Sequence, residues 1–137
     1  MQHVLVYGAM GIVFLALDAV MLSQVMKPLF ERNLGEALLD SPRYGPAAVF
    51  YLFFVFGLWF FAVRPAMSDD SLWTAVWLGA FIGALGYGTY EFTNLATLRD
   101  WSWQMVMTDF TWGAVLSGVT AGAGLLVARA LGLAGAA

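Results

Sequence analysis

Four long apolar stretches dominate the chain, and short polar segments separate them. They run over residues 4–26, 47–63, 72–98 and 103–127. A helix needs about 20 apolar residues to cross a bilayer, because the hydrocarbon core is about 30 Å thick and each helical residue adds about 1.5 Å. The pattern therefore predicts four transmembrane helices in a single domain, residues 1–137.

The longest polar connection lies between the first two stretches. Lys27-Pro28 predicts the end of the first helix and Arg64-Pro65 the end of the second, since proline removes a helical hydrogen bond. Apolar residues recur among the charges of this connection at positions 30, 34, 37 and 38, a spacing that suits a short helix on the membrane surface; an ordered loop is the alternative. The predicted fold class is an all-α polytopic membrane protein, a four-helix bundle with this short interfacial segment.

Small residues recur every three or four positions in the last two stretches. Gly79 and Gly83 lie in the third stretch, and Gly113, Ser117 and Ala121 lie in the fourth. Small side chains at this spacing let membrane helices approach closely, which is how helices associate inside a bilayer. The third and fourth helices are therefore expected to pack tightly together.

The composition excludes several classes of function. The chain is 61% hydrophobic and 11% charged, which is outside the range of soluble domains. Six scattered basic residues and a net charge of −3 give no basic patch, so no nucleic-acid partner is expected. Cysteine is absent and His3 is the only histidine, which excludes disulfides and iron–sulfur ligation and argues against imidazole-bound metals. No metal site and no cofactor is predicted.

Three acidic residues interrupt the apolar stretches. Asp18 precedes the end of the first helix by eight residues, Glu91 precedes the end of the third by seven, and Asp109 follows the start of the fourth by six. At the rise of a helix, each carboxyl group lies about 9–12 Å below the same face of the membrane. An ionised carboxylate near the bilayer centre costs about 2.5–3.5 kcal/mol, so the three should face inward and meet at one level.

Polar and aromatic residues share the faces of these acids. Helical spacing puts Tyr87, Glu91 and Asn94 on one face with Tyr90 beside them, and it puts Asp109 and Trp112 on one face. The candidate ligand-binding residues are thus Asp18, Tyr87, Tyr90, Glu91, Asn94, Asp109 and Trp112. Further candidate hydrogen-bond donors are Trp101, Thr89, Thr93, Thr108 and Thr111, with Lys27, Arg43 and Arg99 reaching down from the surface.

The sequence resembles the DUF2177 family of small bacterial membrane proteins of unknown function. The resemblance covers nearly the whole chain, and its most specific part is the run Thr89-Tyr90-Glu91-Phe92-Thr93-Asn94-Leu95-Ala96-Thr97. Other matching segments are Leu15-Ala16-Leu17-Asp18, Pro46-Ala47, Phe50-Tyr51, Phe61-Ala62-Val63-Arg64-Pro65-Ala66, Trp101 and Asp109-Phe110-Thr111-Trp112-Gly113. Family members usually have aspartate at the position of Glu91 and tryptophan near that of Met21. The resemblance implies a multi-pass protein of the bacterial inner membrane and supplies no activity.

The leading hypothesis is an intramembrane pocket whose partner is a membrane lipid or another small amphiphilic molecule. Its polar head would lie near Glu91, Asn94 and Asp109, and its apolar body along the aromatic second helix. The main rival is a proton- or cation-coupled transporter, expected to be a homodimer because four helices enclose little volume. Three further hypotheses are a lipid-modifying enzyme with paired carboxyl groups, a non-catalytic assembly subunit, and a buried network that only holds the helices in register.

Overall fold

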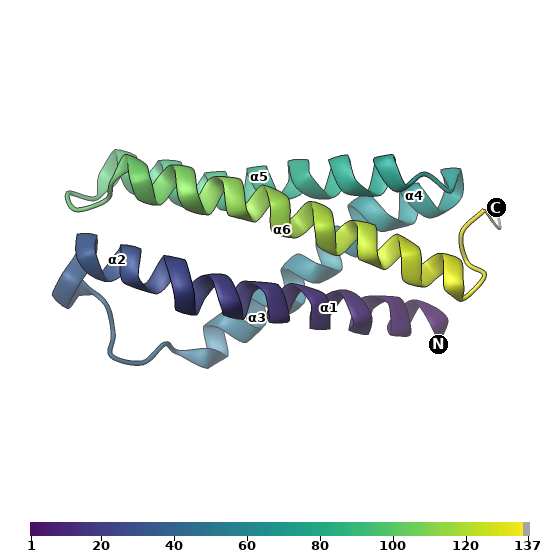
Figure 1. Ribbon diagram of the computed structural model, residues 1–137, viewed down its shortest axis with the longest axis horizontal. Coiled ribbons are helices and arrows are strands. Elements are labelled where there is room, and N and C mark those ends of the chain that lie inside the picture. Colours follow the sequence, from purple (N-terminus) through teal and green to yellow (C-terminus); the bar gives the residue numbers. More distant parts are fainter. Residues whose placement is uncertain (136–137) are drawn as a thin grey trace.

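The protein folds into helices that run roughly parallel and antiparallel to one another (Figure 1). The computed structural model describes residues 1–135, which contain no strand. The elements in chain order are α1 (Gln2–Met21), η1 (Leu22–Met26), α2 (Lys27–Leu34), η2 (Gly35–Ala37), α3 (Tyr44–Leu58), η3 (Trp59–Val63), α4 (Arg64–Asp69), α5 (Leu72–Thr97) and α6 (Trp103–Ala130).

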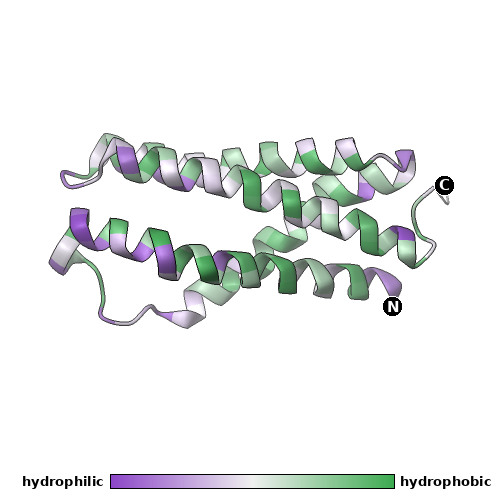
Figure 2. Cartoon of the chain, viewed as in Figure 1, coloured by the Kyte–Doolittle hydropathy of each residue, from purple (hydrophilic) through white to green (hydrophobic). Residues whose placement is uncertain are grey.

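These elements join into four continuous helices that are long and apolar enough to cross a membrane. They are Gln2–Ala37, Tyr44–Asp69, Leu72–Thr97 and Trp103–Ala130. Figure 2 shows hydrophobic residues over the middle of the bundle and polar residues gathered toward its ends, most clearly on α2. We name the end with both termini and the turn at Asp70 the terminal side, and the end with residues 35–43 and 98–102 the loop side. The predicted all-α membrane fold is confirmed.

Two of the four helices do not end where their prolines predicted. The backbone N–H of Lys27 donates to the carbonyl of Leu22, and that of Arg64 donates to the carbonyl of Trp59. These bonds between residues five apart define the π-helical turns η1 and η3, each of which immediately precedes a basic residue and a proline. A proline ring clashes with the carbonyl four residues earlier, and a wider turn there relieves the clash. The helix therefore continues past Pro28 into α2, and part of the connection predicted to lie on the membrane surface instead extends α1.

Helices α5 and α6 pack against each other along the predicted small residues. A Cβ atom at Gly79 would lie 2.6 Å from the Cβ of Ala121, and one at Gly83 would collide with the backbone carbonyl of Gly113. A Cβ at Gly113 would overlap the ring of Tyr87. The two backbones therefore approach each other as closely as they do only because these side chains are missing.

The remaining core lies where α1 and α3 meet α6. Met10 and Phe14 of α1 and Leu58 of α3 are fully buried, as are Leu116 and Leu125 of α6. Met10 packs over Gly124, where an added Cβ would lie 2.6 Å from the methionine sulfur. The contact of α1 and α3 with α6 is thus apolar at these positions.

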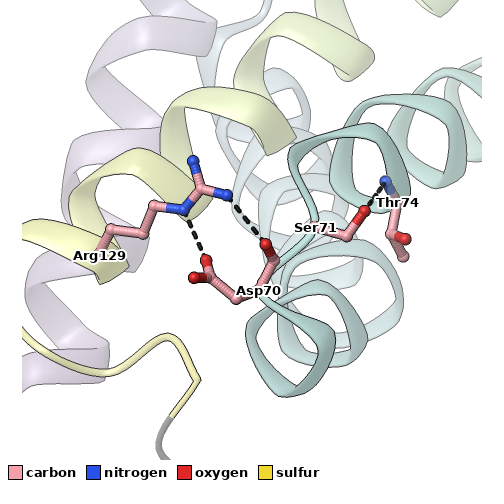
Figure 3. A network of polar contacts seen from close by, with 4 residues as sticks. All are labelled: Asp70, Ser71, Thr74 and Arg129. Atoms are coloured by element: carbon pink, nitrogen blue, oxygen red, sulfur yellow. Dashed lines mark hydrogen bonds and ion pairs between the residues drawn. The ribbon is translucent and has the colours of Figure 1, made fainter.

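Polar caps and one ion pair close the terminal side (Figure 3). The Nε of Arg129 lies 2.6 Å from Oδ1 of Asp70, and its Nη2 donates to the Asp70 carbonyl at 3.0 Å. Ser71 caps α5 by accepting from the backbone N–H of Thr74 at 3.2 Å, and at the opposite end Ser102 caps α6 in the same way. The ion pair ties the end of α6 to the α4–α5 turn.

The close approach of α5 and α6 predicts which glycine is sensitive to substitution. Gly83→Ala should lower the free energy of unfolding by about 1–3 kcal/mol, because the new methyl group meets backbone that cannot rotate away. Thermal unfolding in mild detergent measures the effect. The matched control is Gly57→Ala, since nothing lies within 4 Å of a Cβ at Gly57. Equal melting temperatures for the two variants would contradict this account.

Candidate functional site

Asp18 lies in the middle of the bundle and accepts two aromatic hydrogen bonds. Its carboxyl group comes from α1 and the residue is only 5% exposed. The Tyr51 hydroxyl of α3 donates to Oδ2 at 2.6 Å, and the Trp112 indole of α6 donates to Oδ1 at 3.1 Å. One carboxylate thus joins three helices.

Glu91 and Asp109 form a pair of carboxyl groups nearer the loop side. Glu91 is fully buried and Asp109 is 9% exposed, and their carboxyl groups lie side by side, close enough to interact directly. The indole of Trp101 folds back from the α5–α6 turn and donates to Oε2 of Glu91 at 2.8 Å. Asp18 is close enough to Asp109 for their charges to interact. The three acids from the first, third and fourth helices therefore gather inside the bundle, as the sequence predicted, but not at one level: the first helix continues past Pro28, and Asp18 lies farther from the loop side than the Glu91 and Asp109 pair.

Aromatic residues from α2, α3 and α5 surround the acids. Phe30 of α2 meets the Trp101 ring edge-on at 5.4 Å, which helps to seal Glu91 from the loop side. On the other side, Tyr87 packs edge-on against Phe54 at 5.8 Å and lies over Gly113. Aromatic rings therefore flank the acids on two sides: Phe30 and Trp101 toward the loop side, and Tyr87 and Phe54 away from it.

Two of the predicted site residues lie at the edge of this arrangement. Tyr90 is 52% exposed and meets the rim of Trp101, and Asn94 is half-buried. The inward face of α5 follows every fourth residue from Gly79 to Glu91, so the next residue on it is Leu95 rather than Asn94. The five residues that are brought together as expected are Asp18, Tyr87, Glu91, Asp109 and Trp112.

Of the expected donors, the indoles of Trp101 and Trp112 donate to the acids, whereas the basic residues and the threonines of α5 do not. Among residues 1–135 the only ion pair is Arg129–Asp70. No lysine or arginine therefore pairs with Asp18, Glu91 or Asp109 in this part of the chain. The hydroxyls of Thr89, Thr93 and Thr97 donate to carbonyls of their own helix.

Sequence reasoning missed Tyr51 as a member of the site. Its hydroxyl makes the shorter of the two bonds to Asp18. The available signal was a lone hydroxyl-bearing ring within a span that is otherwise rich in phenylalanine and tryptophan. That signal becomes meaningful only once Asp18 is known to lie opposite.

Two grooves are lined by the residues that donate to Asp18. The α1/α3 groove, of about 550 Å³, is lined by Gly8, Gly11 and Leu15 of α1 and by Tyr44, Ala48 and Tyr51 of α3, among others. The α1/α6 groove, of about 400 Å³, is lined by Met21 and by α6 residues that include Thr108, Thr111 and Trp112. Each groove is thus walled by one of the two aromatic donors to Asp18.

The arrangement leaves hydrogen-bonding capacity unused inside the bundle. Within the described residues Oε1 of Glu91 is buried and has no donor. The donors that do contact the acids are neutral phenol and indole groups, which compensate a buried carboxylate less well than a cation does. A group that brings a hydrogen-bond donor therefore matches this site chemically.

The fold and the buried polar site define a small polytopic membrane protein with four candidate spans. A family model described as a predicted membrane protein, DUF2177, matches residues 3–126, and the chain belongs to this family. No curated protein and no solved structure matched the chain.

Removing the Tyr51 hydroxyl tests whether the network holds the helices together. Tyr51→Phe should lower the free energy of unfolding by about 1–3 kcal/mol, because it leaves a buried carboxylate oxygen without its donor. In a protein that already carries Asp18→Asn, the same substitution should cost less, so a double-mutant cycle of melting temperatures isolates the pair.

Tyr44→Phe is the matched control for the loss of a hydroxyl group. The Tyr44 ring is exposed, and its hydroxyl has no protein partner among residues 1–135. Its melting temperature should therefore equal that of the wild type. Strictly additive losses in the Tyr51 and Asp18 cycle would refute the interaction.

Proposed function

We propose that the protein binds a lipid-like or small amphiphilic molecule in the α1/α3 groove. The observation that carries the proposal is the double role of Tyr51. Its ring lines the apolar groove while its hydroxyl donates to buried Asp18 at 2.6 Å. An apolar groove with the Tyr51–Asp18 contact at its wall matches a molecule with an apolar body and one polar head.

The size and lining of the groove support a chain-like ligand. A volume of about 550 Å³ lies within the range of small-molecule sites, about 300–1,000 Å³. Gly8 and Gly11 form its floor on α1, and nothing lies within 4 Å of the space that a Cβ at either would take. The floor is therefore smooth and open, as the passage of an acyl chain requires.

The polar head is expected to be a hydrogen-bond donor, such as a hydroxyl or ammonium group. Because the Tyr51 hydroxyl gives its proton to Asp18, its oxygen lone pairs are left to accept from a ligand. Glu91 and Asp109 do not line the groove. They would influence the ligand through their charge rather than by direct contact. We therefore expect the head at Tyr51 and Asp18 instead of at Asn94.

Filling the groove tests the proposal. Gly11→Leu should remove the amphiphile that copurifies with the wild-type protein in mild detergent, as measured by lipid mass spectrometry. The fold should survive, because the new side chain enters open space. Gly57→Leu is the matched control: it is also open to a Cβ but does not line the groove. Retention of the same molecule by Gly11→Leu at wild-type levels would disprove the proposed site.

A proton- or cation-coupled transporter is the second candidate. The observation that favours it is Glu91, a fully buried acid with an unpartnered oxygen beside a second acid. Buried ionisable pairs in membranes are typical of proton relays.

Glu91→Gln distinguishes the two candidates. In proteoliposomes that enclose a pH-sensitive dye, addition of the amphiphile identified by mass spectrometry should acidify or alkalinise the lumen through a coupled transporter. The Gln variant should fold and lose this response, because glutamine cannot exchange a proton. A simple binding protein should give no response in either form and should retain its ligand in both.

A further inference from the structure

Arg64 lies at the terminal side, where the apolar part of the second span ends. It follows η3 directly, and Ser68, Asp69 and Asp70 come soon after it. Its guanidinium carbon lies 4.6 Å from the ring centroid of Phe60 and 5.5 Å from that of Trp59. These two rings, which we name the aromatic platform, thus hold one exposed cation near the terminal-side end of the second candidate span.

The π-helical turn makes the aromatic platform possible. In a regular α-helix, at about 100° per residue, Arg64 would stand about 40° from Phe60 but about 140° from Trp59. It could then cover only one of them. The wider turn of η3, closed by the Arg64 N–H bond to the Trp59 carbonyl, brings both rings under the guanidinium. The interruption of this helix therefore fixes the position of Arg64.

His3 adds a second donor beside the same indole. Its ring meets Trp59 edge-on with centroids 5.7 Å apart, and it comes from the first turn of α1. The Nε1 donor of Trp59 is buried and has no partner within the described residues. The cluster therefore offers the N–H groups of Arg64 and His3 beside the same indole ring.

The chain itself supplies no anion to this cluster. Among residues 1–135 Arg64 makes no ion pair and no side-chain hydrogen bond, and the nearby Asp70 is engaged by Arg129. A guanidinium whose face is stacked keeps its edge N–H groups directed outward, which is the geometry that binds phosphate in a bidentate manner.

We propose that Arg64 and His3, both packed against the Trp59 ring, bind the phosphate group of a membrane phospholipid at the terminal-side boundary of the bilayer. The site is separate from the α1/α3 groove and does not depend on the proposed function. Lys27 occupies the equivalent place after η1, but Leu22 and Ser23 stand where Trp59 and Phe60 stand, so it has no aromatic platform. The chain thus contains its own control.

Native mass spectrometry of the full chain in maltoside detergent tests the proposal. The probe is phosphatidylglycerol, compared with a galactosyl diacylglycerol that has the same acyl chains and no phosphate. The wild-type protein should retain one phosphatidylglycerol and release the glycolipid. Arg64→Gln should bind phosphatidylglycerol about tenfold more weakly, because a charge-assisted hydrogen bond is lost. Lys27→Gln should bind as the wild type does.

Arg64→Lys separates the platform from charge alone. It keeps the charge but loses the planar fork, so it should fall between the wild type and Arg64→Gln. Equal loss in Arg64→Gln and Lys27→Gln, or equal retention of both lipids by the wild type, would overturn the proposal. If inorganic phosphate stabilised the protein but phosphatidylglycerol was not retained, the bound phosphate group would not come from a lipid, and the proposal would also be overturned. Circular dichroism of each variant confirms that its helices are intact.

Discussion

The close approach of α5 and α6 is the constraint on which the arrangement of the site depends. Every fourth residue of α5, from Gly79 to Glu91, faces every fourth residue of α6, from Ala121 back to Asp109. Interlocking ridges four residues apart have a fixed register. The glycine contacts at one end therefore determine that Glu91 meets Asp109 at the other, with Tyr87 seated on Gly113 between them.

This register brings two carboxyl groups together, and the first two helices help to cover them and to supply hydrogen-bond donors nearby. A pair of carboxyl groups inside a membrane protein has to be shielded and given donors. The continuation of α1 past Pro28 places Phe30 against Trp101, and Trp101 in turn donates to Glu91. α3 contributes Tyr51 to Asp18. The π-helical turn before Pro28 is thus part of the site, because a helix that stopped there would leave Trp101 uncovered.

The sequence predicted those features that depend on one helix or on one pair of helices. Apolar length indicated the four spans, small-residue spacing indicated the α5–α6 contact, and the cost of a charge in the bilayer indicated that the three acids face the inside of the bundle. The sequence did not predict features that depend on contact with a further helix or on the local shape of the backbone. Tyr51 resembles its aromatic neighbours until α1 places Asp18 opposite its hydroxyl. Pro28 predicts a helix end because a π-helical turn has no sequence signature of its own.

Glycine shows why function is harder to predict than fold in this chain. Gly79 and Gly83 allow two helices to close on each other, so that no space remains between them. Gly8 and Gly11 have a similarly close spacing on α1, yet no atom of α3 lies within 4 Å of a Cβ at either position. Both glycines instead line the α1/α3 groove. The difference arises because α3 holds large aromatic rings against α1 at Tyr51, which keep the two backbones apart. A small residue therefore closes an interface or opens a site according to what lies opposite, and only the folded bundle determines which.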